Sequence, residues 1–156
     1  AYSSKWHAHS VKNKKGVALE RIDPDAATQD AANWTSASET VGYGTPGYQN
    51  SQYKDASSGG ATGIEPPVWI EESGSYTVSY LLDRPGYSCR AFVFNTSGLR
   101  VADISNHELL GISGKITWSG VANNGSPLQT GVYIFYAEIY HPEGTVKRFK
   151  KAFLIR

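Results

Sequence analysis

The stretch "TWSGVANNGSPLQTGVY" at residues 117–133 decides the fold, because it sets a tryptophan, three glycines and a tyrosine between two apolar runs. Glycines and the "NNG" at 123–125 tolerate positive φ angles, which tight turns require. The stretch contains no carboxylate, histidine or cysteine. We interpret it as a shaped connection between two core strands, in which Trp118 ends one strand facing inward and Tyr133 opens the next.

Alternating apolar and polar residues surround this connection on both sides. Short strands at roughly 8–12-residue intervals, separated by Gly, Pro or Asn turns, are typical of a β-sandwich. The strand candidates are 74–82, 88–98, 99–105, 114–120, 131–141 and 145–156. The sequence therefore predicts an all-β protein whose residues 65–156 form an immunoglobulin-like sandwich of about seven strands. The one helix candidate is "NHELLG" (106–111), at most a turn or two.

The alternation also predicts the core of this sandwich. Ten side chains are expected to be buried: Val78, Tyr80, Leu82, Ala91, Val93, Ile116, Trp118, Tyr133, Phe135 and Phe153. Cys89 alternates with two of them, so we expect a buried and inert thiol. It is the single cysteine, which excludes an intrachain disulfide.

The charge and the apolar content of the chain argue against nucleic-acid binding and against membrane insertion. The 156 residues carry a net charge of +1, which provides no field to attract nucleic acid or anionic lipid. No apolar run approaches the length of a membrane span, so membrane insertion is not expected. The chain has no methionine, even at position 1, and we expect that it begins inside a longer protein.

Residues 1–52 differ from the rest, because they contain one clear strand candidate, "GVALERI" (16–22), within turn-rich sequence. A single strand cannot close a core and leaves its ladder unpaired. We read this part as a partial β-sandwich segment that adds to a sheet edge of the same chain or of a second copy. A strand-exchanged homodimer through residues 1–52 is one such arrangement. Residues 53–64 are small and polar, and we predict a flexible linker there.

The spacing of Trp118, Gly120, Gly125, Gly131 and Tyr133 resembles the signature of the FlgD-like immunoglobulin-type family. The resemblance covers about residues 65–156. Ser119 and Ala122 replace acidic positions that are common in that family, so no cation site is carried over.

Residues 1–52 resemble the C-terminal end of a bacterial lamin-tail domain, through "LERI", Asn33-Trp34 and "GYGTPGYQNS". In surface proteins of the Bacteroidetes such a domain is often followed by a FlgD-like β-sandwich. The two resemblances imply a secreted or cell-surface protein on the outer membrane exterior of a Gram-negative bacterium. They also imply a non-catalytic module that acts as a type IX secretion signal or as an attachment domain, with secretion machinery or surface components as partners.

Three groups of residues could carry chemistry or binding. His7 and His9 share one face if "WHAH" is a strand, but no third zinc ligand is pre-placed beside them, and we expect ordinary surface histidines. The loop 42–53 offers Tyr43, Tyr48 and Tyr53 as a carbohydrate platform, which is the alternative function; the competing interpretation is that its tyrosines plug the sandwich.

The third group is the basic run of Lys147, Arg148, Lys150 and Lys151. It suits an edge strand protected from aggregation, or a docking surface for secretion machinery. On a strand, the adjacent Glu71 and Glu72 would point to opposite faces, so we do not expect a glycosidase pair there. We expect no enzyme activity and no cofactor.

Overall fold

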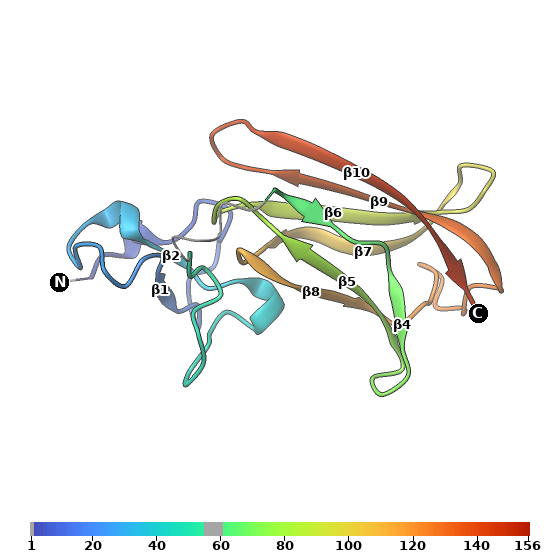
Figure 1. Cartoon of the computed structure of the whole chain (residues 1–156), viewed down its shortest axis with the longest axis horizontal. Coiled ribbons are helices and arrows are strands. Elements are labelled where there is room, and N and C mark those ends of the chain that lie inside the picture. The colour runs from blue at the N-terminus through green and yellow to red at the C-terminus, as the bar shows by residue number, and fades with distance from the viewer. Residues whose placement is uncertain (1, 55–60) are drawn as a thin grey trace.

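Two packed antiparallel sheets form most of the molecule, and an N-terminal segment sits against one end of them (Figure 1). The computed structural model describes residues 2–54 and 61–156. The strands are β1 (Leu19–Arg21), β2 (Trp34–Ser36), β3 (Gly63–Ile64), β4 (Val68–Ile70), β5 (Ser75–Leu81), β6 (Ser88–Phe94), β7 (Arg100–Leu109), β8 (Ser113–Trp118), β9 (Gly131–Tyr140) and β10 (Val146–Ile155). The 3-10 helices are η1 (Ser4–Trp6), η2 (Ala31–Asn33) and η3 (Glu39–Val41). None of the helices in the described ranges is long and apolar enough to traverse a bilayer.

One sheet has the strand order β10-β9-β6-β7, and the other has β5 at its centre with β8 on one side. On the other side of β5, β3 and β4 pair with successive parts of the same strand. Pro66 and Pro67 lie between β3 and β4 and interrupt the ladder, because proline has no N–H to donate. Counted with β3 and β4 as one edge, the sandwich has seven strands, and the predicted all-β class is confirmed.

The core lies between the two sheets and is close to the predicted one. Nine of the ten expected side chains are buried, and the exception, Tyr133, is half-buried because its hydroxyl reaches out to donate to the Gln129 carbonyl. Tyr87 and Leu110, both fully buried, were not expected there. Cys89 is buried as predicted, and the loss of solvation raises the pKa of its thiol to about 12.

The predicted helical turn at 106–111 is wrong. Strand β7 continues through this segment to Leu109, which pairs with Ser88 of β6. His107 has a φ of 64°, and the register between β6 and β7 shifts at bulges. Cross-strand pairing thus overrides the local helix propensity of "HELL".

The N-terminal segment does not extend a sheet of its own sandwich. Within the described residues its strands β1 and β2 pair with each other in a separate two-stranded sheet, so the expected addition to an intrachain sheet edge is wrong. The buried side chain of β1 is a carboxylate, Glu20, which is only 3% exposed. It accepts hydrogen bonds from the Thr45 and Ser51 hydroxyls and from the Gln52 backbone N–H. These bonds explain how a charged group is tolerated there.

Buried hydrogen bonds join this segment to the β7–β8 connection of the sandwich. The Gln52 side-chain amide donates to the Leu110 carbonyl at 3.0 Å, and the Ser38 hydroxyl donates to the Leu109 carbonyl at 2.9 Å. The Ile112 N–H donates to the Ser51 carbonyl at 3.0 Å. Since these groups are buried, the hydrogen bonds tie the segment to the sandwich in one fixed arrangement.

The structure describes residues 53–54 and 61–64 of the predicted linker at 53–64. Its residues 55–60 lie outside the described part of the chain. At its far end, Gly63 and Ile64 form β3, and Ile64 is 2% exposed within the core. These last residues therefore belong to the sandwich and not to a linker, because pairing with β5 buries them.

The junction carries an acidic group whose ionisation opposes folding. Burial, reinforced by the nearby charge of Glu39, raises the pKa of Glu108 above its usual range. A carboxyl with a raised folded-state pKa stabilises the fold below its unfolded pKa of 4.5, and this contribution is lost as the pH rises through the folded-state pKa.

We therefore expect Glu108→Gln to raise the melting temperature at pH 7, by a gain in stability within about 1 kcal/mol, and to leave it unchanged near pH 4. Thermal melts from pH 4 to 8 test this, with the exposed Glu72→Gln as control; a parallel pH profile for wild type and Glu108→Gln would contradict it.

Candidate functional site

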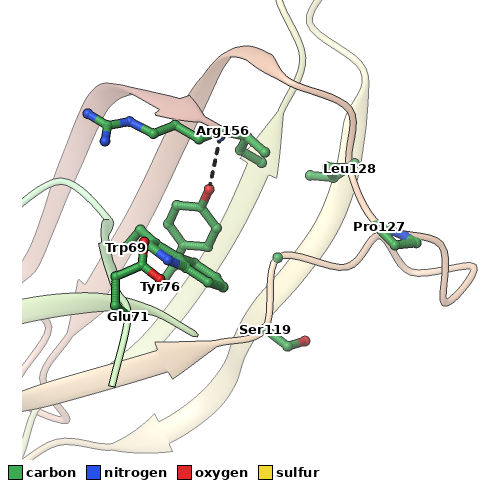
Figure 2. A pocket seen from close by; sticks show the side chains of 9 residues that line it. Trp69, Glu71, Tyr76, Ser119, Pro127, Leu128 and Arg156 are labelled. Atoms are coloured by element: carbon green, nitrogen blue, oxygen red, sulfur yellow. Dashed lines mark hydrogen bonds between the residues drawn. The ribbon is translucent and has the colours of Figure 1, made fainter. Parts of the chain in front are cut away.

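A hollow of about 350 Å³ opens beside Trp69, where the edge strand β4 meets the end of β10 (Figure 2). Trp69 lies on β4 and packs edge-on against the Tyr76 ring of β5, with centroids 5.1 Å apart. The Tyr76 ring is 4% exposed, and its hydroxyl accepts a hydrogen bond from the Arg156 backbone N–H at 3.4 Å. Pro127 and Leu128 close the opposite wall. The hollow therefore combines residues that are far apart in the sequence.

Gly120, the first glycine of the 117–133 stretch, shapes one wall of this hollow. Gly120 has a φ of +81°, and a Cβ atom built on it would lie 3.1 Å from the Tyr76 ring. Beside it, the Trp118 indole N–H donates to the Val121 carbonyl at 3.1 Å, and the Leu128 N–H donates to the Gly120 carbonyl at 3.1 Å. The tryptophan–glycine spacing thus lets the loop turn tightly over Tyr76, which confirms that the stretch is a shaped connection.

A second hollow of about 400 Å³ adjoins the first and shares Trp69, Glu71 and Arg156 with it. It lies between β4 and the last residues of β10, which are edge strands of different sheets. Large apolar side chains are exposed on both strands: Val68 by 55%, Trp69 by 37% and Leu154 by 50%. We call these two hollows and their rim the open-side groove. Apolar walls with one carboxylate and one guanidinium at the rim suit the binding of a partly apolar group with a polar end.

Reasoning from the sequence did not find the open-side groove. The available signal was "PPVWI" at 66–70, an apolar run directly after two prolines. Proline confines such a run to an edge strand, and an apolar edge strand with an exposed tryptophan is a docking candidate.

The two histidines do not lie on a strand face, so that part of the expectation is wrong. His7 follows η1 and its Nδ1 lies 2.9 Å from the Ser36 hydroxyl, while His9 is exposed in a turn. Partial burial and, secondarily, the charge of Lys14 lower the pKa of His7. In residues 2–54 and 61–156 no three His, Cys, Asp or Glu side chains gather closely enough to hold a metal ion.

The tyrosines of the loop 42–53 differ in how far their side chains are exposed. Tyr48 is 84% exposed, so it does not plug the sandwich. Tyr43 has a φ of 63°, and partial burial together with its hydrogen bond to Glu39 raises its pKa to about 12. Tyr53 is half-buried. A sugar platform on this loop would therefore present one largely exposed ring, that of Tyr48.

The basic run lies on β10, which is an edge strand of the β10-β9-β6-β7 sheet, as the edge-strand interpretation expects. Lys147 binds Asp83 at 3.2 Å and Thr62 at 2.9 Å. Hydrogen bonds, that of Thr62 first, lower the pKa of Asp83 to about 2. Arg148 pairs with Glu138 at 2.8 Å, whereas Lys150 and Lys151 are exposed. The first two cations thus have structural partners, whereas Lys150 and Lys151 form no ion pair within residues 2–54 and 61–156.

No protein-family profile matches the chain, and no curated protein matches it. Among solved structures, it is similar to FlgD from Pseudomonas aeruginosa, with a TM-score of 0.43 and 18% identity over 55% of this chain and 65% of that one. It is also similar to PorZ, described as an essential bacterial surface component of the type IX secretion system of Porphyromonas gingivalis. That similarity has a TM-score of 0.37 and 18% identity over 67% of this chain and 13% of PorZ. The chain spans less than two thirds of the length of either protein, and the fold assignment rests on its own strands.

Proposed function

We propose that this chain is a non-catalytic module of a larger exported protein, and that it directs export or attaches the protein to the cell surface through the open-side groove. The observation that supports this most is the exposed apolar surface on β4 and β10. Three large apolar side chains at this edge, Val68, Trp69 and Leu154, are more than a third exposed. Apolar groups gathered on a soluble surface mark a place where another molecule docks.

The geometry of the groove favours a protein partner. The two edge strands β4 and β10 present backbone groups that no further strand covers in the described parts of the chain. An extended segment of a partner can pair with such an edge while its apolar side chains enter the adjoining hollows. The resemblance of residues 65–156 to FlgD-like modules that act as type IX secretion signals suggests that this partner belongs to the secretion machinery.

Export of a reporter tests the proposal. The whole chain, residues 1–156, is fused to a periplasmic reporter in a type IX-competent bacterium, and the reporter is measured at the surface and in the medium. We expect export only with the chain attached, and a fall of about tenfold with Trp69→Ala or Leu154→Glu, since a buried aromatic anchor commonly contributes more than 1 kcal/mol to binding.

The matched control is Leu99→Glu, which changes another leucine, 64% exposed, in the β6–β7 turn, where it lines neither hollow of the groove. All variants are first compared by thermal melting, so that misfolded protein is not scored as failed export. Equal loss with Leu99→Glu, or export that is unchanged by both groove variants, would show that the groove is not the recognised surface. Reporter retained in the periplasm with the wild-type chain would contradict the export role itself.

A further inference from the structure

The outward face of the β10-β9-β6-β7 sheet carries three aromatic rings side by side. Phe92 of β6 stacks on Tyr136 of β9, with centroids 6.4 Å apart and an interplanar angle of 7°. Phe94 meets the same tyrosine edge-on at 6.3 Å. All three rings are only partly buried, whereas the neighbouring residues that point to the opposite side, Val93 of β6 and Phe135 and Ala137 of β9, are buried in the core. Flat, partly exposed rings on a rigid sheet are suited to stacking against a ligand.

A hollow of about 370 Å³ lies at the edge of these rings, next to the β6–β7 turn. Phe94, Ile134 and Tyr136 form its apolar floor, while Thr96 of the turn and Lys150 of β10 stand at its border. Lys150 is directly opposite Tyr136 in the β9–β10 register, so the two side chains leave the sheet as cross-strand neighbours on the same face, and both line the hollow. A hollow with an apolar floor and a few polar groups is the usual form of a small-ligand site.

The charges around these rings favour an anionic ligand. Glu138 is paired with both Arg90 and Arg148, and the Arg100 guanidinium pairs with Asp103 while it covers the Phe92 ring at 3.7 Å. The face therefore carries four cations, Arg90, Arg100, Arg148 and Lys150, against two carboxylates. In the described part of the chain Lys150 has no ion-pair partner, so its charge is available at the hollow.

We infer that this outward face of β6, β9 and β10 binds an anionic polysaccharide, with a sugar ring against Tyr136 and Phe94 and a carboxylate of the glycan on Lys150. Both chemical features of a uronic acid are matched: its apolar ring face by the aromatic floor, and its carboxylate by the free ammonium group. Nucleic acid fits less well, because the net charge of +1 provides little of the field that phosphate binding requires. This site is separate from the open-side groove, and the inference does not depend on the export role.

Titration of the whole chain with oligogalacturonate tests this, with fully methyl-esterified oligogalacturonate as the matched uncharged ligand. We expect binding of the acid form and binding at least about tenfold weaker for the ester, since esterification removes the negative charge that Lys150 would contact. Lys150→Ala should weaken binding of the acid form by about the same factor. The control is Lys151→Ala, which removes another exposed charge from the next residue, on the opposite side of the strand. Its affinity should stay within about twofold of the wild type.

The aromatic floor is tested separately with Phe94→Leu and Tyr136→Leu, which keep apolar volume but remove the ring. At least one variant that melts like the wild type should bind the acid form about fivefold more weakly, because it has lost a ring face against which the sugar packs. The inference is overturned if oligogalacturonate does not bind at millimolar concentration, if the ester binds equally well, or if Lys151→Ala weakens binding as much as Lys150→Ala. Equal, Lys150-dependent binding of oligothymidylate would also overturn it, since the face would then select any polyanion and not a sugar.

Discussion

Replacing Trp118 with alanine is expected to destabilise the protein by about 3–5 kcal/mol, the usual cost of removing a large buried aromatic side chain. Trp118 is 8% exposed and packs against the rings of Tyr76 and Phe153, at 5.5 and 6.3 Å. Its indole N–H also donates a hydrogen bond to the Val121 carbonyl. The substitution therefore opens a cavity between these rings and also removes a hydrogen bond from the loop. Urea unfolding followed by circular dichroism measures the effect.

Two further variants separate these causes. Trp118→Phe keeps an aromatic ring in the core but loses the hydrogen bond, and we expect a loss of about 1–2 kcal/mol. Trp69→Ala removes the same side chain from a site that is 37% exposed, and its cost should be clearly smaller. A loss below about 1 kcal/mol for Trp118→Ala would mean that the tryptophan of the 117–133 stretch does not support the core.

Replacing Gly111 with alanine is expected to separate the N-terminal segment from the sandwich, at a cost of about 3 kcal/mol. A Cβ atom at this position would lie 2.5 Å from the Ser51 carbonyl oxygen. Because that oxygen belongs to the backbone, no change of rotamer relieves the contact. The same oxygen accepts the Ile112 N–H, so moving it breaks a hydrogen bond that joins the two parts.

Native-state hydrogen exchange measures this effect segment by segment. In Gly111→Ala we expect amide protection to fall in β1 and β2 and to remain in β5, β6 and β9, because opening of the junction leaves the sandwich core intact. The control is Gly63→Ala, where a new Cβ atom meets no atom within 4 Å and φ is not positive. Equal loss of protection in both parts would instead indicate that the segment and the sandwich unfold as one cooperative unit.

The sandwich was predictable because its signal is local. In β5, Tyr76, Val78 and Tyr80 alternate with polar residues, and alternate side chains of a strand necessarily share a face. Turn glycines are similarly informative, since Gly120 is needed where φ is positive. These periodicities hold whatever the strand pairs with, so the class of the fold and most of its core follow from them.

The N-terminal segment and β7 were less predictable because their structure depends on distant partners. Glu20 is buried only because the hydroxyls that bind it come from a loop 25 and 31 residues further along the chain. The end of β7 is extended because β6 supplies its hydrogen bonds, against the helical preference of "HELL". Neither effect leaves a periodic pattern in the local sequence.

The sequence by itself therefore determined the strands, the turns and the side chains that face the core, since each depends on near neighbours. The tertiary structure alone decided the candidate sites. The open-side groove unites Trp69, Gly120 and Arg156, and the aromatic face unites Phe92, Tyr136 and Lys150. Each set includes residues that are far apart in the chain, Trp69 and Arg156 in the first and Phe92 and Tyr136 in the second, and tertiary structure brings them together, so no local pattern in the sequence specifies it.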